Sequence, residues 1–127
     1  MVFVILAKID HTIYKSNAYS SIYRREIKNK FDSVTECRLG KWYHTDAKDK
    51  FGHTKGYSQV DQPHKRIHSL VDKNIAYISN GDKVVENKEE IIENFKGIER
   101  ESQNLYAVME KMINEADSIC DIEGDCR

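Results

Sequence analysis

The chain has 127 residues, of which 20 are Lys or Arg and 21 are Asp or Glu, so its formal net charge is −1. This length predicts one compact domain that can bury a core of its own. The balanced charge excludes the basic footprint of proteins that bind nucleic acid or anionic membranes nonspecifically. A single Pro, six Gly and abundant Lys and Glu favour long helices over a β-sandwich.

The longest apolar run, residues 2–7, is far shorter than the ~20 residues of a membrane span. It also has neither a preceding basic residue nor the cleavage site of a secretory signal. We therefore expect a cytoplasmic protein. Three cysteines are an odd number, which makes a disulfide framework a poor explanation and turns attention to metal or redox chemistry at Cys37.

The first predicted helix covers residues 2–28, where two apolar rows advance in helical steps. The first row consists of Val2, Leu6, Ile9, Ile13, Tyr23 and Ile27. The second row consists of Val4, Ala7, His11, Ala18 and Ile22. Two rows predict burial on two sides, as in a helix that belongs to a bundle and also meets a partner.

A short helix is predicted after a charged turn at residues 28–32. Ser33 and Glu36 have the spacing of a capping box, which places Cys37 in the first turn of this helix. Gly40 within it favours a short element that ends near residue 43. Residues 44–62 show no sustained period and are predicted as a loop, with His44 and His53 exposed to solvent.

Two longer helices complete the prediction. Pro63 suits the first turn of the third helix, with Asp61 or Gln62 as its cap and Asn80-Gly81 as its end. The fourth helix begins near Asn87. Its apolar seam is the most regular of the chain and consists of Ile91, Phe95, Ile98, Ser102, Leu105, Met109, Met112, Ala116 and Ile119.

Four side chains from three predicted helices form a candidate metal site. His64 and His68 are four residues apart on one helical face, although this spacing also fits a pair that binds no metal. His11 lies in an apolar row, where it is either a ligand or a core histidine with a hydrogen-bond partner. Cys37 near a helix start favours the thiolate, although most free cysteines are inert. Three imidazoles and one thiolate suit tetrahedral Zn²⁺ best.

Three segments of the chain, residues 7–11, 37–43 and 63–68, together resemble the chemoreceptor zinc-binding domain family, over roughly residues 5–80. The pattern is a His, then a Cys followed by Leu-Gly-Lys-Trp, then Pro-His-x3-His. The resemblance implies the zinc ligands His11, Cys37, His64 and His68. It also implies a cytoplasmic helical bundle that forms homodimers and controls chemoreceptor signalling helices or a diguanylate cyclase. Tyr14 stands where the family often has Trp.

The sequence therefore predicts an all-α antiparallel bundle of about four helices, stapled by one zinc site. The domain covers residues 1–119, and residues 120–127 form a frayed acidic tail. Cys120 and Cys126 in this tail could also bind metal or cross-link under oxidation. We expect the chain to be either one domain of a longer receptor or a free-standing sensor.

The expected function is that of a zinc-binding sensory domain in bacterial signal transduction of the chemotaxis type. It would sense oxidants such as hypochlorous acid through the zinc-bound Cys37 thiolate, or sense zinc itself. One alternative is a structural dimerisation domain stapled by zinc. A three-His zinc hydrolase is disfavoured, because Cys37 would close the position that a catalytic water needs. We expect no enzymatic activity, since no catalytic motif occurs.

Overall fold

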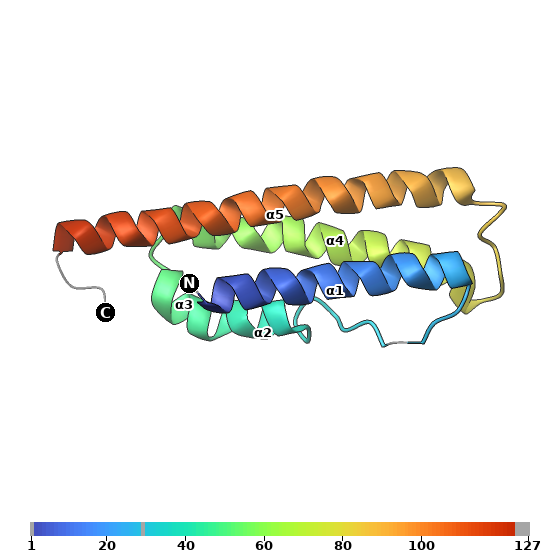
Figure 1. Cartoon of the computed structure of the whole chain (residues 1–127), viewed down its shortest axis with the longest axis horizontal. Helices are drawn as coiled ribbons and strands as arrows, with labels where there is room; N and C mark the ends of the chain where they lie inside the picture. The colour runs from blue at the N-terminus through green and yellow to red at the C-terminus, as the bar shows by residue number, and fades with distance from the viewer. Residues whose placement is uncertain (1, 29, 124–127) are drawn as a thin grey trace.

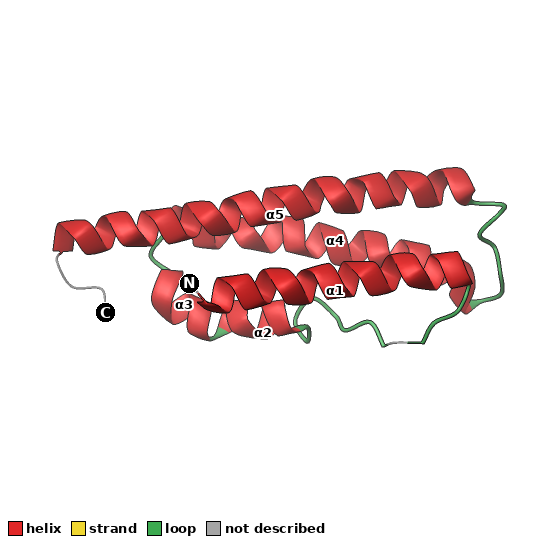
Figure 2. Cartoon of the chain, viewed as in Figure 1, coloured by secondary structure: helices red, strands yellow, loops and turns green. Residues whose placement is uncertain are grey.

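The computed structural model describes residues 2–28 and 30–123, with side chains at residues 4–28 and 30–116. The helices are α1 (Val2–Arg24), α2 (Arg38–His44), α3 (Asp46–Phe51), α4 (Lys55–Ser79) and α5 (Lys88–Glu123). The described residues contain no strand, so the predicted all-α class is confirmed (Figure 2). The structure has one helix more than the predicted four, because α3 forms within the segment that was predicted as a loop.

The three long helices lie side by side along the length of the molecule, and α2 and α3 cover one end (Figure 1). In that view α1 and α4 run in the same direction, and α5 lies alongside them and runs in the opposite direction. The connection between α1 and α2 returns the chain alongside α1. This return brings α2 next to the first half of α1 and the beginning of α4.

The core lies mainly between α4 and α5, which share the largest interface. The predicted seam of α5 is buried at Ile91, Ile98, Ser102, Leu105, Met109, Met112 and Ala116. It meets Val60, Ile67 and Val71 of α4, which are fully buried. The seam prediction is therefore confirmed at these positions, while the side chain of Ile119 lies outside the described residues.

The two rows of α1 have opposite environments. The second row is buried against the bundle at Val4, Ala7, His11, Ala18 and Ile22. The first row is exposed at Leu6, Ile9, Ile13 and Tyr23. Ile27 is exposed as well but lies beyond the helix, because α1 ends at Arg24 and not at the predicted residue 28. Burial on one side is thus confirmed. Among the described residues the other row stays exposed, so the predicted burial on its side is not seen within this chain.

The beginning of α2 differs from the prediction. Its first residue is Arg38, and Cys37 is the N-cap, which accepts a hydrogen bond from the Gly40 amide. Ser33 donates to the Glu36 carboxylate at 2.9 Å, and these residues form a turn ahead of the helix. The predicted capping box is wrong in this respect, because Ser33 and Glu36 bond to each other.

The beginning of α4 was also predicted wrongly. Thr54, not Asp61 or Gln62, caps the helix by accepting from the Tyr57 amide, and Pro63 lies inside α4. The Glu115 carboxylate of α5 accepts from the Lys55 and Gly56 amides at 3.2 and 2.8 Å. The free amides of this helix end are therefore satisfied by a distant residue, which no local pattern reveals.

Both predicted ends of the α4–α5 connection are close to the observed ones. α4 ends at Ser79 with Asn80 as C-cap, and Gly81 follows with φ of 103°, a conformation that favours glycine. α5 begins at Lys88, directly after Asn87. At the other end α5 continues past Cys120 to Glu123, so the predicted tail is helical up to that residue, and Cys126 lies outside the described residues. Among the described helices, none combines the length and apolar character needed to cross a membrane.

Candidate metal centre

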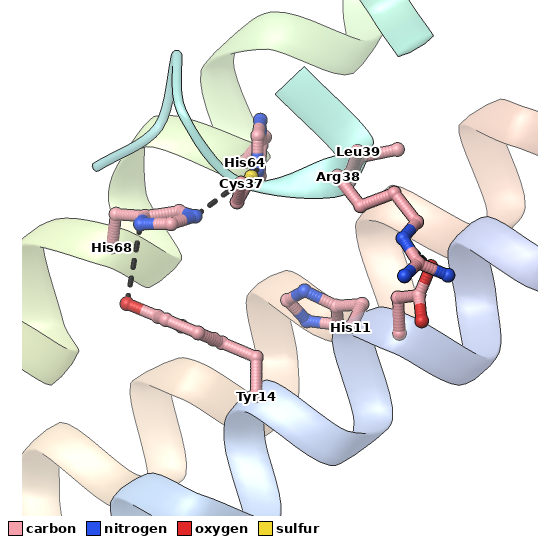
Figure 3. Close-up of a pocket in the computed structure, with 8 residues that line it drawn as sticks. His11, Tyr14, Cys37, Arg38, Leu39, His64 and His68 are labelled. Carbon is pink, nitrogen blue, oxygen red and sulfur yellow. Dashed lines mark hydrogen bonds and ion pairs between the residues drawn. The ribbon is translucent and has the colours of Figure 1, made fainter. Parts of the chain in front are cut away.

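Three of the four predicted ligands converge at the junction of α2 and α4. The Cys37 Sγ atom lies 3.3 Å from His64 Nε2, which lies 3.1 Å from His68 Nε2. All three atoms lie within 4.8 Å of one another. His64 and His68 face the same side because they are one helical turn apart on α4, and the loop before α2 places Cys37 over them (Figure 3).

His11 lies on α1, across the same cavity from the two histidines of α4 (Figure 3). Its Nε2 atom is 3.2 Å from the hydroxyl oxygen of Ser102 on α5. The ligand atoms of His11 do not belong to the group that lies within 4.8 Å. The structure thus brings Cys37, His64 and His68 together and places His11 on the facing wall.

The turn ahead of α2 holds Cys37 in place through its backbone. The Cys37 amide donates to the Ser33 carbonyl at 2.9 Å. The Val34 carbonyl passes so close to Gly40 that a β-carbon at Gly40 would collide with it. Gly40 is therefore required for this turn to fold over α2, and the turn determines where the sulfur points.

The three histidines of the cavity are neutral at pH 7. Burial, with a smaller contribution from Lys15, lowers the pKa of His11 to about 4. Burial, reinforced by His68 and His11, lowers the pKa of His64 to about 3. The pKa of His68 is lowered by burial as well. Neutral imidazoles have the free lone pair that a metal ion needs.

The protonation state of Cys37 differs from the prediction that its position favours the thiolate. Burial raises the pKa of the Cys37 thiol, and backbone amides, including that of Gly40, lower it by less. The helix-start amides are present, but desolvation of the charge outweighs them. A cation among these side chains would reverse this balance, because a thiol that coordinates a metal loses its proton.

Two further groups border the cavity. The Tyr14 hydroxyl lies 3.1 Å from His68 Nδ1, and the two rings are 4.6 Å apart. Asp10 lines the cavity and pairs with Arg38 at 3.3 Å. Tyr14 is one turn after His11, so this spacing was a usable signal. Nothing in the sequence links Asp10 to Arg38. His44 and His53 are exposed, as predicted.

The donors and the size of the cavity fit zinc. One sulfur and two imidazole nitrogens face one another, a set that prefers Zn²⁺ over harder cations. The cavity has a volume of about 30 Å³, enough for a small ion or a water molecule and too small for an organic substrate. Cys37, His64 and His68 are therefore positioned to bind a metal ion.

Comparison with known proteins agrees with this site. No curated protein and no solved structure matches the chain. The chemoreceptor zinc-binding domain family matches residues 11–75, half of the chain and the part that carries every candidate ligand. This family is a zinc-binding domain of chemoreceptor-type signalling and is not a catalytic family. With the converging cysteine and histidines in place, the chain belongs to the chemoreceptor zinc-binding domain family.

Proposed function

We propose that the chain is a sensory domain that holds Zn²⁺ through His11, Cys37, His64 and His68 and responds to oxidants such as hypochlorous acid at Cys37. The observation that carries this proposal is the contrast in accessibility among the four side chains. His11, His64 and His68 are buried, whereas Cys37 is partly exposed. The one oxidisable ligand is therefore the one that solvent can reach.

The proposed reaction uses the sulfur of Cys37. Hypochlorous acid transfers its oxygen to the thiolate, an S–O bond forms, and the O–Cl bond breaks with release of chloride. The sulfur loses two electrons and becomes a sulfenic acid. A neutral sulfenic acid is a poorer metal ligand than a thiolate, so oxidation weakens the hold on zinc.

The structural consequence follows from where Cys37 lies. It is the N-cap of α2, a helix of seven residues, whereas the histidines belong to long helices of the bundle. Loss of the sulfur ligand therefore frees the short helix and the turn before it, and leaves the α4–α5 core intact. We propose that this local change is what an attached signalling domain detects.

Zinc sensing by occupancy of the same site is the second candidate function. It uses the same four residues but needs a zinc affinity near the free concentration in the cell. A purely structural zinc domain would bind zinc tightly and have a thiol that does not react with oxidants. The partial exposure of Cys37 favours the oxidant sensor over this structural role.

We also propose a cytoplasmic homodimer that meets through the exposed row of α1. Leu6, Ile9 and Ile13 follow heptad spacing and are about half exposed. Such a row is typical of a seam between two helices. Sedimentation equilibrium of Ile9→Lys, which places a charge in the row, is expected to show a monomer where the unsubstituted chain is a dimer.

The sensing proposal is tested by measuring zinc release against hypochlorous acid. The matched control lacks Cys120 and Cys126 and keeps Cys37 as its only cysteine. This control is expected to release zinc as readily as the unsubstituted chain, and Cys37→Ala is expected to show no oxidant-dependent release. Equal release from Cys37→Ala would show that the sensor is elsewhere. Zinc content of His11→Ala tests the fourth ligand.

A further inference from the structure

Ser102 of α5 is unusual, because it is a polar residue within an apolar seam. It is 1% exposed and lies one turn from Ile98 and from Leu105, which are completely buried. A buried hydroxyl is costly unless it forms hydrogen bonds. Ser102 has two partners, the Ile98 carbonyl at 2.7 Å and His11 Nε2 at 3.2 Å.

The two partners determine which nitrogen of His11 carries the proton. A serine hydroxyl has one proton, and Ser102 donates it to the Ile98 carbonyl, which can only accept. The Ser102 oxygen must therefore accept from His11, so His11 Nε2 carries a hydrogen. A neutral imidazole has one N–H, which leaves Nδ1 of His11 with a free lone pair. No hydrogen bond among the described residues occupies that nitrogen.

His68 has the opposite arrangement. Its Nδ1 atom lies 3.1 Å from the Tyr14 hydroxyl, and its Nε2 atom points to His64 and Cys37. A histidine that binds a metal usually bonds its other ring nitrogen to a nearby group, which sets the ring orientation. Tyr14 plays this part for His68 through Nδ1, and Ser102 is placed to play it for His11 through Nε2.

We infer that Ser102 is a positioning residue for the zinc site, which holds His11 so that it binds through Nδ1 while His64 and His68 bind through Nε2. This inference rests on the proposed function in requiring His11 to be a ligand. It also gives α5 a direct part in the site, since the hydroxyl that orients His11 is itself held by the α5 backbone. All three long helices then contribute to metal binding.

The first test uses the zinc-free chain and observes ring nitrogens by long-range ¹H–¹⁵N NMR correlation. We expect His11 to carry its proton on Nε2, and Ser102→Ala to lose this preference. Ser21→Ala is the matched control, because Ser21 is also buried and donates to the carbonyl four residues earlier, that of Asn17. A proton on Nδ1 of His11 in the unsubstituted chain would overturn the inference.

The second test adds Zn²⁺ and follows the same nitrogens. Zinc is expected to shift Nδ1 of His11 and Nε2 of His68, and Ser102→Ala is expected to weaken zinc binding about 10- to 100-fold. Ser21→Ala should bind zinc as the unsubstituted chain does. Coordination of His11 through Nε2 would overturn the inference and leave the four-ligand site standing. If zinc shifts neither nitrogen of His11, the proposed ligand set and this inference are both wrong.

Discussion

Neighbouring residues of α4 lie in two very different environments within a single turn. Ile67 points into the dry interface with α5, and its neighbours His64 and His68 point into the polar cavity beneath α2. The apolar interface needs only side chains of suitable size, because burial is favourable in any direction. The cavity needs donors from two separate elements, the N-cap of α2 and the helix α4, to meet within 4.8 Å.

This difference separates the region that keeps the molecule folded from the region that is positioned to bind a metal ion. The α4–α5 interface is apolar at its centre, where Ile98 and Leu105 are completely buried, and the ion pair of Arg66 and Glu101 lies beside it. The packing of these apolar side chains should contribute the same free energy to folding with and without zinc. The cavity holds neutral histidines and a protonated thiol, whose protonation depends on pH and on a bound metal ion.

The largest expected effect is that of zinc on the free energy of unfolding, which should depend on the cavity. Zinc at about a thousandfold above its Kd should stabilise the chain by about 4 kcal/mol, provided that it binds only the folded state. His64→Ala should lose nearly all of this gain, because it removes the central donor of the cluster. Urea unfolding with zinc and with a chelator measures this gain in stability. His53→Ala, which changes an exposed histidine, is the control and should keep the full gain.

The second effect tests the apolar interface. Leu105→Ala should lower the free energy of unfolding by about 3 kcal/mol, since it opens a cavity at a fully buried position. The loss should be equal in zinc-loaded and zinc-free protein, as measured by urea unfolding. A loss that appears only with zinc present would mean that the core and the cavity are not independent.

The third effect is a pH dependence of the zinc-free chain. The pKa of His11 is about 4 in the folded state and 6.5 without burial, so the unfolded state takes up the proton first as pH falls. Stability that is fully present above pH 6.5 is therefore lost between pH 6.5 and 4. For His11 alone the loss is about 2 kcal/mol at pH 5.

Urea unfolding of the zinc-free protein at pH 7 and pH 5 measures this loss. His11→Gln removes the titrating group and should reduce the difference between the two pH values, whereas His53→Ala should leave it unchanged. An undiminished pH dependence in His11→Gln would show that His11 is not buried as a neutral group.

The smallest effect concerns the rim of the cavity. Arg38 pairs with Asp10, but its side chain is 77% exposed, so solvent screens the attraction. Arg38→Gln should change the free energy of unfolding by less than about 1 kcal/mol. Its zinc affinity should stay within a few-fold of the unsubstituted value, as measured by competition with a chromophoric chelator. A larger loss would make Arg38 part of the site rather than of its edge.

Local patterns predicted the long elements well and the short ones poorly. The seam of α5 and the buried row of α1 follow from periodicity, because a helix that packs on a core must repeat its apolar residues. The start of α4 was missed although Thr54 caps it locally, and the bonds of Glu115 to the Lys55 and Gly56 amides come from the far end of α5, where no local pattern shows them. The prediction of the start of α2 failed because the Ser33 hydroxyl bonds to Glu36 rather than to the backbone.

The amino-acid sequence by itself determined the helical class, the core faces of the long helices and the identity of the candidate ligands. The class and the core faces depend on residue type and spacing within one element, and the ligands on short motifs in three segments of the chain. Only the tertiary structure decided that Cys37 lies over His64 and His68, that Tyr14 faces His68, and that Ser102 meets His11. These contacts join residues far apart in the chain, so they exist only after the helices have packed and burial has set their distances.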